Sequence, residues 1–182
     1  DPDLRIETLK GKSFFISETQ ENKLKSAKEF AKYTKIVEER ALFYYNNKEH
    51  VAYLKGVDPN FTAVNGFNKF LYAGDWLEPN TNQVVVGSGI SRKLALGLFD
   101  FNNVLEVYMP KPGSGMIENP EDDFNKAPLL TSGIFQVSED IDEKYIFSSI
   151  PLAQGLLNYK PNQLTYIDFK TAPNVSESDA IE

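Results

Sequence analysis

The chain has 182 residues and a mass of 20.6 kDa, which suffices for one domain or two small subdomains. Apolar residues make up 41% and aromatic residues 13%, a composition that supports a folded core. A net charge of −7 disfavours binding to nucleic acid or anionic lipid surfaces. With no cysteine, the chain has no disulfide, thiolate metal site or cysteine nucleophile.

The first 57 residues predict a β-α-β unit that leads into a hairpin. Residues 3–8 alternate as a strand does, and apolar residues recur at helical spacing over residues 20–33. Residues 35–45 and 49–57 are rich in strand-forming residues. The pair Asn46-Asn47 lies between them and tolerates the positive φ of a tight hairpin turn.

The middle of the chain is predicted to be β-rich. The irregular stretch 58–83 supplies the expected core anchors Phe61, Phe67, Phe70, Leu71 and Trp76. The elements predicted after it are strands at 83–86, 104–109, 129–137 and 145–148, a helix capped by Ser88 that ends at Leu96, and a helix from Pro151 to about Asn158. A last strand covers 163–170, and Ser176 is expected to cap a helix that is cut short.

No motif in the sequence predicts catalysis, a metal site or a cofactor. His50 has no cysteine or second histidine with which to share a metal, so a surface or packing role is expected. Neither Gly-Ser-Gly run, at 87–89 or 113–115, fits a nucleophile elbow or a phosphate-binding loop. The acidic clusters 121–123 and 139–143 are interpreted as solvated turns. A calcium site or a carboxylate-dependent hydrolase is the alternative.

The connection 110–128 is the stretch best suited to binding a partner. It joins two predicted neighbouring strands and is far longer than the two to five residues of an ordinary hairpin loop. The apolar pair Met116-Ile117 at its centre suits docking into a concave partner. The alternative is an insertion without function. The predicted partner-binding residues are Pro112, Gly113, Ser114, Gly115, Met116, Ile117, Glu118, Asn119 and Pro120.

Five short phrases, in their order and spacing, resemble the extracytoplasmic domain of MacB/FtsX-type ABC-transporter permeases, most closely the lipoprotein-releasing LolC/LolE branch. They are Leu54-Lys55-Gly56-Val57-Asp58-Pro59, Gly74-Asp75-Trp76-Leu77-Glu78-Pro79, Val84-Val85-Val86-Gly87-Ser88-Gly89-Ile90, Leu130-Thr131-Ser132-Gly133-Ile134-Phe135 and Ile146-Phe147-Ser148-Ser149-Ile150-Pro151-Leu152-Ala153-Gln154. Gly133 within a predicted strand indicates a bulge or a close approach of another backbone. Asn102-Asn103 departs from the Gly-Asp usual in that family.

The resemblance implies an α+β fold in two parts. A mixed α/β porter subdomain with two β-α-β-like halves would be discontinuous, at residues 1–45 and 162–182. An inserted β-rich sabre subdomain would cover 46–161 and carry the hairpin 110–128 as a hook, in which Asn119-Pro120 is similar to an Asn-Pro of the family.

The resemblance also implies a function at the periplasmic face of the bacterial inner membrane, with no catalysis and no cofactor in this chain. The chain has no apolar run long enough to cross a bilayer and no signal peptide, so it is expected to be a domain excised from between transmembrane helices. Implied partners are a cytoplasmic ABC ATPase, a second permease subunit and a periplasmic lipoprotein carrier or adaptor protein. Lipoprotein release is favoured, and a MacB-like efflux or antimicrobial-peptide pump and an FtsX-like regulator of a cell-wall hydrolase are the alternatives.

Overall fold

The computed structural model describes residues 3–27, 30–112 and 123–171, which form a mixed α+β structure. Its strands are β1 (Leu4–Glu7), β2 (Phe14–Phe15), β3 (Phe30–Tyr45), β4 (Lys48–Val57), β5 (Leu71–Gly74), β6 (Gln83–Gly87), β7 (Leu105–Pro110), β8 (Phe124–Phe135), β9 (Tyr145–Ser149), β10 (Gln163–Leu164) and β11 (Tyr166–Thr171). Its helices are α1 (Glu18–Ser26), α2 (Phe61–Asn65), the 3-10 helix η1 (Phe67–Phe70), α3 (Ser88–Leu94), α4 (Glu139–Asp142) and α5 (Ile150–Leu157).

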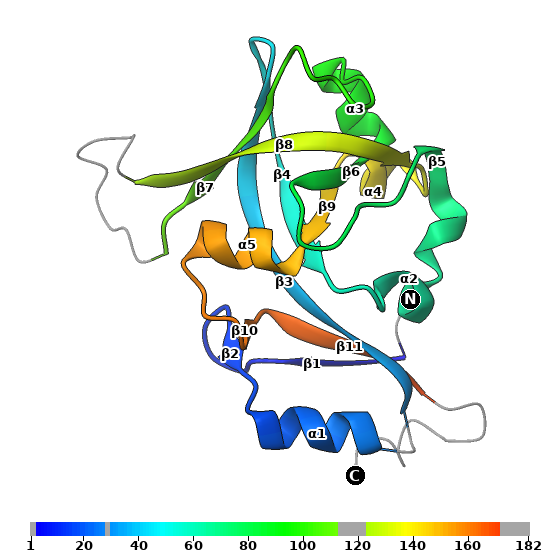
Figure 1. Ribbon diagram of the computed structural model, residues 1–182, viewed down its shortest axis with the longest axis vertical. Coiled ribbons are helices and arrows are strands. Elements are labelled where there is room, and N and C mark those ends of the chain that lie inside the picture. Colours follow the sequence, from blue (N-terminus) through cyan, green and yellow to red (C-terminus); the bar gives the residue numbers. More distant parts are fainter. Residues whose placement is uncertain (1–2, 28–29, 113–122, 172–182) are drawn as a thin grey trace.

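Within these residues, nine strands form one mixed sheet in which β3 is the shared element (Figure 1). The strand order is β1-β11-β3-β4-β9-β6-β8-β5, and β7 pairs with both β3 and β8. The strands β3, β4, β9, β6, β8 and β7 therefore form a closed, barrel-like ring of hydrogen-bonded neighbours. In the lower part of Figure 1, β1 and β11 extend the sheet from the first half of β3, and α1 lies below them.

The helix predicted at residues 20–33 is wrong in its second half. A capping box starts α1, because the Ser17 hydroxyl accepts the Gln20 N–H and the Gln20 side chain accepts the Ser17 N–H. The helix ends at Ser26, and from Phe30 the chain is strand β3, which pairs antiparallel with β11 through Tyr33 opposite Phe169. Pairing with a strand over 130 positions away along the chain (Tyr33 to Phe169) overrides the local helical pattern.

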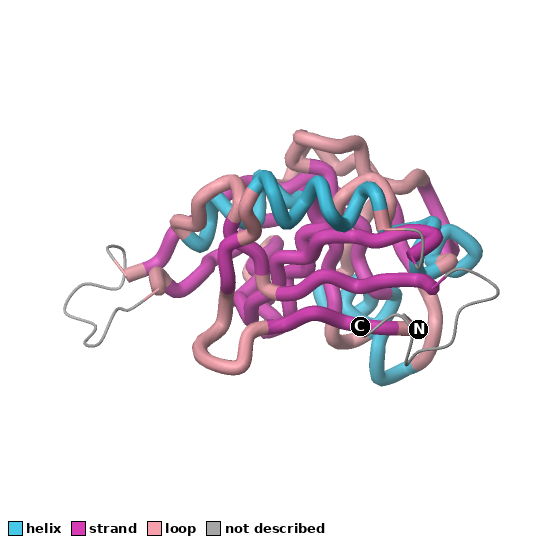
Figure 2. Tube along the Cα trace, turned by 90° about the horizontal axis from the view of Figure 1, so that it is seen from below, coloured by secondary structure: helices cyan, strands magenta, loops and turns pink. Residues whose placement is uncertain are grey.

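Two apolar clusters fill the structure. In the larger one, residues of α5 and Leu24 of α1 pack against residues of the strands. Figure 2 shows a helix lying over the strands. Half of the residues in the smaller cluster are aromatic, and it confirms the predicted anchors of the 58–83 stretch. Phe61 is buried and stacks on Trp76 with ring centroids 6.1 Å apart, while Phe67 and Leu71 pack at its edge. Phe70 contacts the Phe67 ring edge-on.

Ser88 does not cap the helix that follows it. Gly87 is the N-cap, and the Ser88 hydroxyl instead lies 3.1 Å from Oδ2 of the buried Asp142. The helix ends at Leu94 rather than Leu96, because Ala95 takes a left-handed conformation. The interpretation of 139–143 as solvated turn residues is also wrong for Asp142, which additionally accepts the Val137 N–H at 2.7 Å. A buried carboxylate needs such partners.

Other predictions from local chemistry are confirmed. Asn46 and Asn47 form the β3–β4 turn with φ of 51° and 65°. Ser149 caps α5, which begins with Pro151 in its first turn and ends at Asn158 in a left-handed conformation. Two predictions differ from the structure. The single strand predicted at 163–170 is divided into β10 and β11, and the stretch 58–83, which was predicted to be irregular, contains α2, η1 and β5.

The division into porter and sabre subdomains at residues 45 and 162 stays a prediction. The helix start at Ser176 and the acidic residues 121–122 lie outside the described residues. Over residues 3–27, 30–112 and 123–171, none of the helices has the length and apolar character needed to cross a bilayer.

Gly133 occupies the close approach that its place in a strand predicted. The β6–β8 register shifts between Val84 and Val85, opposite Thr131 and Gly133. A side-chain carbon on Gly133 would lie 2.3 Å from the Asp75 carbonyl oxygen. The backbone would have to move to relieve this steric clash.

We expect Gly133→Ala to lower the free energy of unfolding by about 1–3 kcal/mol, because the added methyl group is forced against main-chain atoms. Urea denaturation followed by circular dichroism measures the loss. Gly97→Ala is the matched control, because a side-chain carbon there has no neighbour within 4 Å. A loss of similar size in both variants would contradict the assignment.

Asp100 organises the loop between α3 and β7. Its carboxylate accepts the Tyr45 hydroxyl, and also the backbone N–H groups of Asn102 and Asn103 at 2.9 and 3.1 Å. These bonds, that from Tyr45 above all, lower the pKa of Asp100 to about 2. The Asn102-Asn103 pair is thus accommodated by a side-chain-capped turn.

The pKa of Asp100 lies below its unfolded-state value of about 3.9, so its ionised form stabilises the fold. This contribution is complete above about pH 5 and is lost as the pH falls toward about 2. We expect the native chain to be more stable than Asp100→Asn at neutral pH, and this difference to vanish on acidification. Thermal unfolding of both proteins from pH 7 to pH 2 tests this. A difference that stays constant down to pH 2 would refute it.

Candidate functional site

The hairpin predicted to bind a partner has a regular stem. Strands β7 and β8 pair antiparallel from Leu105–Leu129 to Pro110–Phe124, and the Lys111 N–H donates to the Asp123 carbonyl one step beyond, at 2.8 Å. Pro112 follows directly. The remaining predicted partner-binding residues, 113–120, lie outside the described residues. The structure therefore shows the stem of the hairpin and how it joins the rest of the domain.

The stem is held on two sides. On one side β7 pairs with β3, with Tyr108 opposite Leu42. On the other side the Asn125 amide donates to the carbonyl oxygen of Leu156, at 2.7 Å, and to the side chain of Asn158, at 3.2 Å, at the end of α5. Both strands of the stem are thus anchored to the body of the domain before the loop begins.

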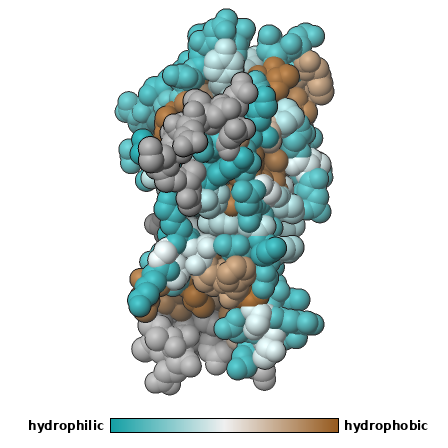
Figure 3. All heavy atoms as spheres, turned by 90° about the vertical axis from the view of Figure 1, so that its left-hand side faces the viewer, coloured by the Kyte–Doolittle hydropathy of each residue, from teal (hydrophilic) through white to brown (hydrophobic). Residues whose placement is uncertain are grey.

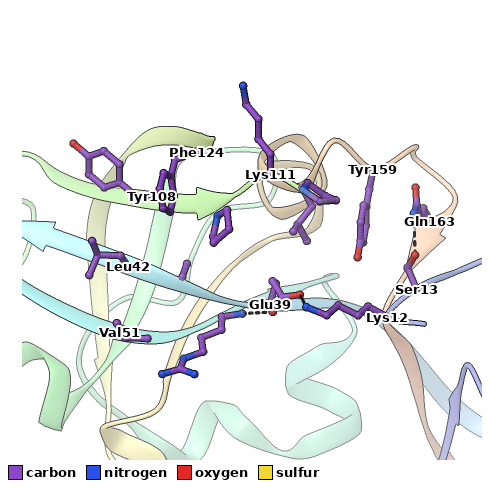
Figure 4. A pocket seen from close by; sticks show the side chains of 15 residues that line it. Lys12, Ser13, Glu39, Leu42, Val51, Tyr108, Lys111, Phe124, Tyr159 and Gln163 are labelled. Carbon is purple, nitrogen blue, oxygen red and sulfur yellow. Dashed lines mark hydrogen bonds and ion pairs between the residues drawn. The ribbon is translucent and has the colours of Figure 1, made fainter. Parts of the chain in front are cut away.

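A groove of about 690 Å³ lies at the base of this stem (Figure 4). It is bounded by the stem, by the end of α5, by the segment after β1 and by β3 and β4. Its lining is mostly apolar, with Leu42, Val51, Tyr108, Pro110, Phe124, Leu157 and Tyr159 as the main apolar and aromatic members. Figure 3 views the molecule from the hairpin side, and there the surface is largely hydrophilic, with apolar residues in small groups.

The two ends of the groove differ in character. In Figure 4, Leu42, Val51, Tyr108 and Phe124 lie toward one end, and polar residues lie toward the other. At the polar end Lys12 pairs with Glu39 at 3.1 Å, and the Gln163 amide donates to the Ser13 hydroxyl at 2.9 Å. Burial is the main cause that raises the pKa of Tyr159. The groove is thus apolar at one end and lined by paired polar groups at the other.

A row of charged and aromatic residues, separate from the groove, crosses neighbouring strands of the sheet. Arg5 pairs with the buried Asp168 at 2.7 Å, and its guanidinium lies 3.9 Å from the Tyr166 ring centroid. The Tyr166 hydroxyl donates to Glu38 at 2.7 Å, and burial together with Glu38 raises the pKa of Tyr166. Lys55 lies among aromatic rings, and burial lowers its pKa. This row joins β1, β11, β3 and β4.

The residues considered above for catalysis or metal binding make contacts that hold the fold together. His50 Nε2 lies 2.9 Å from the Glu143 carbonyl oxygen, which ties β4 to the segment before β9 and fits the expected packing role. Ser88 and Asp142 contact each other between α3 and α4. Among the residues placed in the structure, no three histidine or carboxylate side chains gather as metal ligands would.

Sequence comparison finds similarity to a bacterial transmembrane protein. No family model matches the chain. The lipoprotein-releasing system transmembrane protein LolE of Haemophilus influenzae is 25% identical over 161 residues, which cover 83% of this chain and 34% of LolE. The chain thus spans about a third of the length of this relative.

Solved structures share the fold over most of the chain. The periplasmic region of MacB from Actinobacillus actinomycetemcomitans has a TM-score of 0.61 at 16% identity and covers 88% of this chain and 66% of that one. The extracellular domain of the noncanonic ABC-type transporter YknZ from Gram-positive bacteria has a TM-score of 0.64 at 12% identity, with 91% and 76% covered. A permease domain from Porphyromonas gingivalis has a TM-score of 0.53 at 17% identity, with 86% and 62% covered.

These comparisons point to the same group of proteins as the five sequence phrases. They confirm the mixed α+β fold and leave the residues of the predicted hook untested. The groove was missed from the sequence, because its lining comes from several separate segments and no local pattern unites them. The one available signal was the placement of Tyr108 and Phe124 on either side of the long connection.

We expect Asn125→Ala to loosen the stem, because it removes both side-chain hydrogen bonds to the end of α5. The free energy of unfolding should fall by about 1–2 kcal/mol, and amide hydrogen exchange should accelerate in β7 and β8. Asn68→Ala, on the exposed face of η1, is the control and should change neither. Unchanged exchange in the stem of Asn125→Ala would show that α5 does not anchor it.

Proposed function

We propose that this chain is a MacB-like periplasmic domain of an ABC-transporter permease, and that it couples ATP-driven motion of the transmembrane part to the release of lipoproteins to a periplasmic carrier. The observation that carries the proposal is the similarity to LolE across 83% of this chain. In this proposal ATP is hydrolysed by a separate cytoplasmic subunit, and a second permease subunit stands beside this one. The domain itself transmits movement and catalyses no reaction.

The sheet supports such transmission. The first and last described strands, β1 and β11, lie side by side, with the Asp3 N–H donating to the Phe169 carbonyl at 2.9 Å. Both strands are joined to β3, the Arg5–Asp168 ion pair adding to their backbone bonds. Movement that enters through either strand therefore reaches β3 and, through Leu42–Tyr108, the hairpin stem.

We place carrier docking on Pro112 and residues 113–120 at the end of the stem. Two features support this: the stem is anchored at β3 and α5, and its loop is much longer than the turn needs. The porter part (1–45 and 162–182) would then follow the membrane helices, and the sabre part (46–161) would present the hairpin.

A MacB-like pump is the second candidate, favoured by the shared fold with the MacB periplasmic region. In that case the domain meets an adaptor protein. The two functions differ in the soluble partner that the domain captures.

The test measures binding of this domain to the lipoprotein carrier of the same cell by calorimetry. Replacing residues 113–122 with a short Gly-Ser turn keeps the Pro110–Phe124 pair, so the stem should persist. We expect the carrier to bind the native domain and to lose at least about tenfold in affinity for the variant. As the control, Asp-Gly in place of Asn46-Asn47 alters the other hairpin tip and should bind normally. Binding of an adaptor protein in place of the carrier would overturn the proposal in favour of efflux.

A further inference from the structure

The groove at the base of the stem has the size and lining of a ligand site. Its volume of about 690 Å³ lies within the roughly 300–1,000 Å³ typical of small-molecule pockets. One end presents Leu42 and Val51 from neighbouring strands, with Tyr108 and Phe124 of the stem beside them (Figure 4). Val51 is 46% exposed, so this apolar surface is open to solvent. An apolar ligand would remove it from water.

The groove offers few partners to a peptide backbone. It runs along one edge of β3, over the part that lies between the residues paired with β11 and those paired with β7. The Glu38 N–H on this edge donates to the Thr165 hydroxyl at 2.8 Å, and the Arg40 N–H donates to the Glu39 carboxylate at 2.8 Å. An added strand would find these donors occupied, and its buried carbonyl groups would go unpaired. The lining therefore favours a ligand without amide groups, such as an acyl chain.

The charges that line the groove favour a negative head group. Among the described residues that line it, Lys12, Arg40 and Lys111 are cationic and Glu39 is acidic. The chain as a whole carries a net charge of −7, so this cationic excess is local. Lys12 is 80% exposed in its side chain while paired with Glu39, which leaves it accessible to a second anionic group at the polar end.

We infer that this groove binds one acyl chain of an anionic amphiphile, with the chain against Leu42 and Val51 and the head group near Lys12. The inference goes beyond the proposed transport function. It rests on the groove alone and holds whether or not the hairpin docks a carrier.

The experiment is a titration of the intact chain with the fluorescent fatty acid cis-parinaric acid, displaced by laurate below its micelle concentration. We expect saturable binding at one site. Val51→Asp should weaken it by about tenfold or more, because it places a charge against the acyl chain. Val104→Asp is the matched control, since Val104 is 53% exposed just before β7 and outside the groove lining, and it should bind as the native chain does. Tyr108→Ala provides a second, uncharged test, with circular dichroism confirming the fold of each variant.

Two further arms test the ligand class. Laurate should bind more tightly than dodecyltrimethylammonium, which has a chain of the same length and the opposite charge, and Lys12→Ala should reduce this preference. Absence of saturable binding, or equal weakening by Val51→Asp and Val104→Asp, would overturn the inference. So would displacement of the probe by an acidic peptide but not by laurate. Equal affinity for both amphiphiles would overturn the head-group assignment.

Discussion

The backbone hydrogen bonds of β3 are the constraint on which the rest of the structure depends. The first half of this strand pairs with β11, the second half pairs with β4 on one edge, and Leu42 to Tyr44 pair with β7 on the other. The terminal strands and the closed ring are thus built on one continuous element. Between β11 and β7 a short length of its edge has no strand neighbour among the described residues, and the groove lies there.

Closure of the ring turns the hairpin into an anchored arm. Over Glu106 to Tyr108, β7 pairs with β3 and β8 together, so neither edge of this part of the strand is open to another chain. The Asn125 contacts to α5 restrain the second strand of the stem. Partner binding beyond Pro112 would therefore be transmitted to the body of the domain through paired backbone.

The conspicuous carboxylates of the domain are used to hold elements together. Asp142 joins α3 to α4, Asp168 joins β11 to β1, and Asp100 shapes the loop after α3. Both carboxylate oxygens of each one accept hydrogen bonds from the protein, so these groups contribute to the fold. A domain that transmits movement needs such ties between elements, and this use of charge suits the proposed mechanical role.

The sequence by itself determined the features that depend on neighbours along the chain, such as the Asn46-Asn47 turn and the place of Pro151 in the first turn of α5. It also carried the resemblance to permease domains. It indicated a close approach at Gly133, and the structure identified the Asp75 carbonyl as the group approached. Only the tertiary structure decided that β3 begins at Phe30 and that Ser88 serves Asp142 rather than its own helix. It alone assembled the groove. The physical reason is that the partners of these residues lie far away along the chain, so their pairing exists only once the sheet has formed.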